Sequence, residues 1–211
     1  MKVNLTESEL KRLADVIGEM ETSTSGEIRL MIVGRSSAVG HVAEVFGMAL
    51  VIVSFLALWF LRHEFVLVEH WWMWAAIFGG AFLLSHLLSR FEFFQRHLTS
   101  RADMAAQVWN RAEIEFGREI RGRTRSNTGI LLFLSRMERR AVVLADTGIA
   151  GKLPPETWND VVQMILQGPA TGKWAEKLEG AIRLCGKHLA AHFPQEPDDT
   201  NELPNTVIVK D

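Results

Sequence analysis

The sequence contains a single cysteine, Cys185, and its charges nearly cancel, since 23 Lys and Arg residues stand against 25 Asp and Glu residues. One cysteine cannot form an intramolecular disulfide, so the fold does not depend on one. Cys185 lies on the apolar stripe of a predicted helix, and we expect a buried structural thiol. A formal net charge of −2 gives no general attraction to nucleic acid, and no nucleic-acid partner is expected.

The first 25 residues lack the apolar core of a signal peptide. Charged residues are also missing from residues 45–61, a run of 17, and from residues 71–89, a run of 19 whose one ionisable group is His86. A bilayer core needs about 20 helical residues, with a range of about 17–25. The sequence therefore predicts a transmembrane helical hairpin within residues 41–100. The alternative, two buried core helices, is disfavoured because neither run keeps a polar stripe.

The positive charges around the two runs predict an orientation. The connecting loop, residues 62–70, carries one Arg beside two Glu, whereas Arg35, Arg90, Arg96 and Arg101 lie outside the runs. The positive-inside rule then places both termini in the cytoplasm. We therefore expect a multi-pass protein of the cell inner membrane, with the lipid bilayer and a membrane protein or complex as partners.

The segments on either side of the hairpin predict one small α/β domain. Thr6 and Glu9 form a capping box that begins a helix. Residues 28–33 and 129–135 read as parallel strands joined by a right-handed crossover, and residues 139–145 as the antiparallel partner of the second strand. The expected fold is α/β, a small mixed β-sheet sandwiched between helices with an inserted two-helix transmembrane hairpin. Its parts are residues 1–40, the hairpin 41–100, residues 101–193, and a polar linker and tail, 194–211, with a candidate edge strand near its end.

Three segments carry a resemblance to a known family: SGEIRLMIV at Ser25–Val33, NTGILLFLS at Asn127–Ser135, and the run Arg139–Val162. With these motifs the chain resembles the TPM domain family over residues 5–40 and 100–193. The resemblance implies a small sheet between helices. It also implies a role among those associated with the family, which are phosphatase activity, divalent-metal binding and assistance to membrane complexes. Where many members have Asp before the Gly-apolar strand, this chain has Asn127 and Thr128, which weakens a metal or phosphatase assignment.

The sequence shows no motif for a metal cluster, a phosphate-binding loop or a catalytic triad. His188 and His192 stand four apart on a predicted helix, but no third ligand accompanies them. Metal-assisted hydrolysis needs several carboxylates on one cation, and the loop after the third predicted strand offers Asp146 alone. No cofactor is therefore expected, and a divalent metal at Asp146 is the alternative to a structural Asp in a turn.

The densest charge cluster is basic and follows a predicted helix. It consists of Arg118, Arg121, Arg123 and Arg125, called the Arg cluster below. Guanidinium groups so placed bind phosphate or anionic lipid, or simply form a solvated face. The favoured function is a membrane-anchored TPM-like module that binds a partner or assists a membrane complex. A metal-dependent phosphatase is the first alternative, and binding of anionic lipid or a phosphate ligand by the Arg cluster is the second; the sequence leans against an enzyme.

Overall fold

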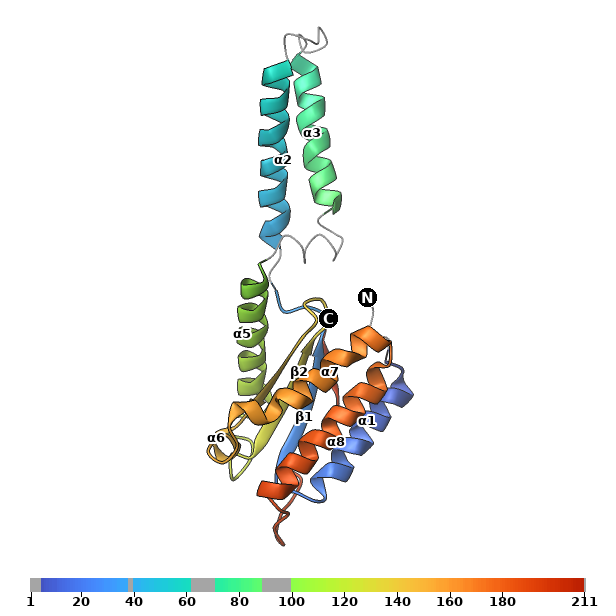
Figure 1. Ribbon diagram of the computed structural model, residues 1–211, viewed down its shortest axis with the longest axis vertical. Coiled ribbons are helices and arrows are strands. Elements are labelled where there is room, and N and C mark those ends of the chain that lie inside the picture. The colour runs from blue at the N-terminus through green and yellow to red at the C-terminus, as the bar shows by residue number, and fades with distance from the viewer. Residues whose placement is uncertain (1–4, 38–39, 62–70, 89–99, 211) are drawn as a thin grey trace. The chain divides into compact units, whose positions relative to one another are not determined.

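The computed structural model describes residues 5–37, 40–61, 71–88 and 100–210, which form two compact units (Figure 1). One unit comprises Met1–Ser36 with Ala105–Asp211, and the other Ser37–Met104. In chain order the elements are α1 (Glu7–Glu21), β1 (Glu27–Val33), α2 (Gly40–Leu61), α3 (Trp71–Leu88), α5 (Arg101–Glu119), β2 (Gly129–Ser135), β3 (Arg140–Ala145), α6 (Thr147–Ala150), the 3-10 helix η2 (Pro155–Trp158), α7 (Asn159–Thr171), α8 (Trp174–His192) and β4 (Ile208–Lys210).

The first unit is built on a four-stranded mixed sheet in the order β3-β2-β1-β4. β1 and β2 are parallel, with Glu27 opposite Gly129 and Val33 opposite Ser135. β2 and β3 form the predicted antiparallel hairpin. Every residue of β1 and β2 is buried, so β2 reads as a nearly continuous apolar run, and β1 is apolar apart from Glu27 and Arg29.

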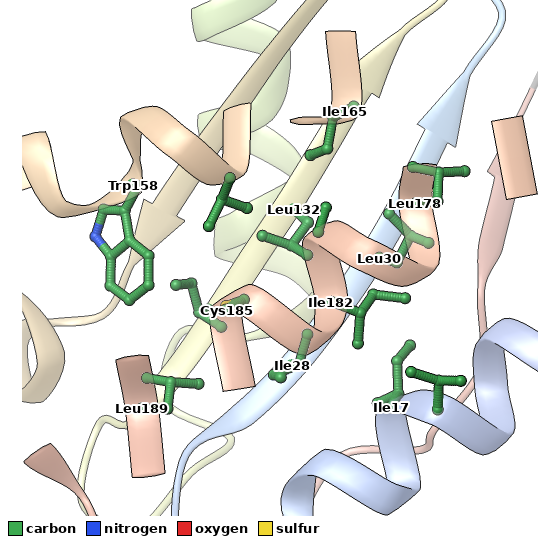
Figure 2. Packing of buried hydrophobic residues seen from close by; sticks show 14 of the residues in the cluster. Ile17, Ile28, Leu30, Leu132, Trp158, Ile165, Leu178, Ile182, Cys185 and Leu189 are labelled. Atoms are coloured by element: carbon green, nitrogen blue, oxygen red, sulfur yellow. The ribbon is translucent and has the colours of Figure 1, made fainter. Parts of the chain in front are cut away.

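Helices cover both faces of the sheet and so make the predicted sandwich (Figure 1). On one face, alternate residues of β1 and β2 such as Leu30 and Leu132 pack with α1, α7 and α8 (Figure 2). On the other face, Met31 and Phe133 pack with α5. Cys185 of α8 is buried in the first cluster, and burial raises the pKa of its thiol well above the usual range.

The C-terminal segment adds β4 to the free side of β1, in parallel. Buried carboxylates fasten it there. Glu27 accepts hydrogen bonds from the backbone N–H groups of Glu202, at 2.9 Å, and Leu203, at 3.3 Å. The ammonium of Lys210 lies 2.6 Å from a carboxylate oxygen of Glu115, whose side chain is fully buried. The candidate edge strand of the sequence is therefore part of the sheet.

The second unit contains α2 and α3, which pack against each other. The rings of Phe55 and Phe78 stack at 6.4 Å between centroids. Gly47 faces Ser85 so closely that a Cβ atom on the glycine would meet the serine oxygen at 2.9 Å. Several large apolar side chains of both helices, among them Met48 and Phe60, are exposed in this unit.

The prediction that this hairpin spans a membrane is wrong. None of the helices in the described parts of the chain combines the length and the apolar character that a span requires. The runs of 17 and 19 residues stood at the short end of the usable range. As folded, α2 includes His41 and Glu44, and α3 ends after 18 residues. The inner-membrane location and the cytoplasmic termini were derived from these spans and are withdrawn with them.

Gly148 provides a test of the packing between α6 and the loop before β2. A Cβ atom at this position would meet the backbone oxygen atoms of Ser126 and Asn127 at 2.4 and 2.7 Å. We expect Gly148→Ala to lower the free energy of unfolding by about 1–3 kcal/mol, the usual cost of overpacking. Urea denaturation measures it. Gly117→Ala, at an open site in α5, should instead raise stability by about 0.5–1 kcal/mol, and equal effects of the two changes would contradict this account.

Candidate functional site

A groove of about 340 Å³ lies along β3, at the opposite edge of the sheet from β4. Its floor is the first part of the strand, Arg140 to Val143. Ala105, Val108 and Trp109 of α5 form one wall. The opposite wall consists of Pro155, Trp158, Asn159 and Val162, from η2 and α7. We call this feature the β3 groove.

The floor of the β3 groove is an open strand edge. In the antiparallel pair of β2 and β3, the N–H group of Asp146 donates to the carbonyl of Gly129 at 2.9 Å. Backbone groups alternate in direction along a strand, so those of Val142 and Leu144 also point to β2. Those of Ala141, Val143 and Ala145 consequently point away from it. Among the described residues no further strand lies beyond β3.

The two walls differ in how they are held. Trp158 is 4% exposed, belongs to the buried cluster (Figure 2), and packs edge-on against the ring of His188 at 6.0 Å between centroids. Trp109 is 47% exposed, although it extends from the same helix as the buried Val108. One indole is therefore fixed by the core, and the other stands in solvent beside the groove.

The charge of the β3 groove is concentrated at one end. Of the described residues that line it, Arg140 is the one that carries a charge. Arg139 precedes it in the turn between β2 and β3, is exposed, and has φ +52°, in the left-handed region. The groove thus joins an apolar slot to a basic end.

The Arg cluster lies at the end of α5 and in the connection to β2. Arg121 stacks over the ring of Phe116, with its guanidinium carbon 5.7 Å from the ring centroid. Arg125 pairs with Glu202 at 3.4 Å, and its backbone N–H donates to the same carboxylate at 2.9 Å. Arg118 and Arg123 are exposed. The four residues are close in the chain, but one guanidinium already has a carboxylate partner.

Asp146 caps the short helix α6. Its side chain accepts a hydrogen bond from the N–H of Thr147 at 2.7 Å and is 5% exposed. Across the described parts of the chain, no three His, Cys, Asp or Glu side chains are grouped so as to hold a metal ion. The observed role of Asp146 is that of an N-cap.

Sequence reasoning missed a second pocket, at the end of α1. This pocket is polar and has a volume of about 160 Å³. Glu21, Glu27 and Asp199 line it, together with Asn201 and Asn205. Burial raises the pKa of Glu21 to about 8, although its carboxylate accepts a hydrogen bond from the N–H of Ile28 at 2.8 Å; the nearby Glu27 raises it further. Burial also raises the pKa of Glu27. No spacing in the sequence marks these carboxylates as neighbours.

The β3 groove also lay outside the sequence predictions. Its apolar walls resemble core positions in the sequence, because Val108 and Val162 continue the stripes of two amphipathic helices. Trp109 gave no signal of a groove, because it falls at helical spacing on the apolar stripe with Ala105 and Ala112, yet it is 47% exposed in the structure. The sheet order was needed to show that β3 is an edge.

No protein-family model matches the chain, and no curated protein matches it. A similar fold occurs in the NMR structure of the BA42 protein from the psychrophilic bacterium Bizionia argentinensis. The TM-score is 0.60 and the identity 20%, over 99% of this chain and 98% of that chain. At this identity the likeness shows the fold alone. The resemblance to the TPM domain family stays a prediction.

The raised pKa of Glu21 predicts a pH dependence of stability. A carboxyl whose pKa is higher in the folded state stabilises the fold below its unfolded pKa, and that contribution is lost as pH rises through the folded value. The free energy of unfolding should therefore decline between the usual value of 4.5 and about 8. Glu21→Gln should make this decline shallower, because the amide stays uncharged.

Urea denaturation at a series of pH values across this interval measures the effect. The exposed Glu113 of α5 supplies the control, and Glu113→Gln should keep the wild-type slope. Some decline should remain in Glu21→Gln, since the pKa of Glu27 is also raised. An identical slope in wild type and Glu21→Gln would contradict the assignment.

Proposed function

We propose that this protein is a binding module that takes up a segment of a partner protein in the β3 groove. The observation that carries the proposal is the coincidence of three features at one place. An open strand edge, two apolar walls with a tryptophan on each, and one cationic end meet there. Among the functions considered from the sequence, partner binding is the one these features fit.

The lining of the groove, rather than its volume, favours a protein segment over a compact small molecule. Sites for drug-sized ligands have volumes of about 300–1,000 Å³, so the groove is at the small end of that range. Its floor is backbone rather than a set of convergent polar side chains. Tryptophan and arginine are also the residues that most often dominate the energy of protein interfaces. Trp109 and Arg140, which line the groove, are residues of these two types.

The phosphatase alternative has less support. A metal-assisted hydrolase needs carboxylates that converge on a cation. Asp146 is engaged as a helix cap, and among the described residues it belongs to no group of three side chains that could hold a metal ion. We therefore keep partner binding as the proposed function, and the absence of phosphatase activity stays a prediction.

Site-specific photocrosslinking in cells tests the proposal. A photoreactive amino acid in place of Trp109 should give a discrete adduct with a partner protein. The same substitution at Ile114, which is also exposed on α5 but does not line the groove, should not. Ala105→Arg, which places a long side chain into the groove, should reduce the adduct at position 109 at least tenfold. Equal adducts at both positions, or none at position 109, would refute the proposal.

A phosphate ligand at the Arg cluster is a second candidate, favoured by one observation. Arg118 and Arg123 are exposed, and neither forms an ion pair with any described residue. Guanidinium groups bind phosphate oxygens through paired N–H donors. We expect pyrophosphate to shift the backbone resonances around Gly122 in a saturable way. Changing all four arginines to Gln should abolish the shifts.

The control for that titration keeps the change in net charge and moves it elsewhere. Changing Lys11, Arg12, Lys152 and Lys187 to Gln removes four positive charges from other exposed positions. This variant should bind pyrophosphate like the wild type, and a parallel loss in both variants would mean that only the overall charge matters.

A further inference from the structure

We infer that the occupant of the β3 groove is an extended peptide segment of the partner, which joins the sheet as a fifth strand, antiparallel to β3. Its side chains are apolar toward both walls, and a carboxylate follows them to face Arg140. The inference rests on the proposed function and adds the conformation and the chemistry of what is bound.

The outer edge of β3 carries backbone groups that point away from the sheet. Ala141, Val143 and Ala145 direct their N–H and C=O groups away from β2, as the hydrogen bond from Asp146 to Gly129 fixes. Such a row of donors and acceptors is a template for another strand. An added strand would lie about 4.8 Å from β3. Antiparallel pairing is favoured because it is slightly more stable per residue than parallel pairing.

The two walls of the groove would each contact one face of an added strand. Along β3, Val142 and Leu144 pack with the cluster under α5, whereas Ala141, Val143 and Ala145 pack with the cluster under α7 and α8. An added strand continues this alternation, since successive side chains of a strand point to opposite faces. One set of its side chains would meet the wall of Trp109, and the other the wall of Trp158. A strand covered on both faces is expected to be a continuous apolar run.

The positive charge at one end of the groove favours a partner segment with a negative charge. Arg140 is the charged residue among the described lining, and the exposed Arg139 is next to it. An anionic side chain in the incoming strand complements this end, whereas a cationic one is repelled. A partner segment with a short apolar run followed by Asp or Glu therefore matches the groove in backbone, faces and charge.

A second copy of the chain fits less well. Its own β3 is flanked by α5 and by η2 with α7, because these walls form the groove in every copy. Two copies paired through β3 would bring both sets of walls to the same place. The groove accommodates a single strand without flanking helices, which is the form of an extended peptide.

The test uses the full-length protein and a synthetic peptide of defined sequence, KKAVVLAD, acetylated and amidated at its ends. Its last six residues repeat residues 141–146. In the antiparallel register in which its second Val lies opposite Val143, its Asp lies opposite Arg140. Amide hydrogen exchange by NMR is the readout. The amides of Ala141, Val143 and Ala145 should exchange at least tenfold more slowly with saturating peptide. Those of Val142 and Leu144, already bonded to β2, should not change.

Two substitutions separate backbone pairing from simple apolar contact. Val143→Pro removes an outward N–H group at an edge position where proline is tolerated, and it should weaken peptide binding at least tenfold. Val143→Ala keeps that N–H group and should bind within about threefold of the wild type. Arg140→Glu should prefer the peptide whose Asp is changed to Lys over the original one.

The outcomes distinguish this inference from the proposed function. If the peptide does not bind at millimolar concentration, or binds without slowing the three outward amides, strand addition is refuted. A photocrosslinked adduct at position 109 would in that case still support a partner in the groove. If the adduct is absent as well, both the inference and the proposed function fail.

Discussion

The parallel pairing of β1 with β2 is the interaction on which the rest of the first unit depends. The two strands are far apart in the chain but align over their full length, from Glu27 opposite Gly129 to Val33 opposite Ser135. Every residue of both strands is buried. Because their side chains alternate between two faces, this one pairing creates two apolar surfaces that must both be covered. The helices α1, α7 and α8 cover one, and α5 covers the other.

The two edges of this sheet differ in whether the chain covers them. Beyond β1 the C-terminal segment closes the edge, and buried charges hold it there. Beyond β3 the helices on the two faces leave a slot rather than a lid. Sheet edges are ordinarily shielded because they invite pairing with other chains. A protein that protects one edge with its own residues and leaves the other open between apolar walls has the asymmetry that a strand-binding function requires.

The local elements followed from sequence because their signals are local. The capping box of Thr6 and Glu9 begins α1 as expected, and the short polar turn after Ser135 joins an antiparallel hairpin. The predicted membrane spans were wrong, because the length of the two apolar runs and their lack of a polar stripe did not distinguish a span from another apolar helix. The TPM-domain resemblance and the role of the Arg cluster stay predictions.

The groove and the carboxylate pocket could not be predicted for a different reason. Both depend on which segments become neighbours in space. Glu21 and Asp199 line one pocket from opposite ends of the sequence. Trp109 and Trp158 line one groove only because the sheet ends at β3. Periodicity identifies the buried face of a helix, but it does not reveal where a sheet ends.

The closure of β1 by the C-terminal segment has a consequence for synthesis. β1 is among the first elements to be made, but its partner β2 begins about a hundred residues later and β4 later still. The guanidinium of Arg29, buried in the finished sheet, donates to the carbonyl of Pro204, 175 residues further along the chain. At a translation rate of about 5–20 residues per second, that partner follows roughly 10–35 s after Arg29 itself. Glu119, which lies 3.6 Å from Arg29 in the finished sheet, is made before Pro204, but the mostly apolar β1 stays without its final edge partner until nearly the whole chain has been made.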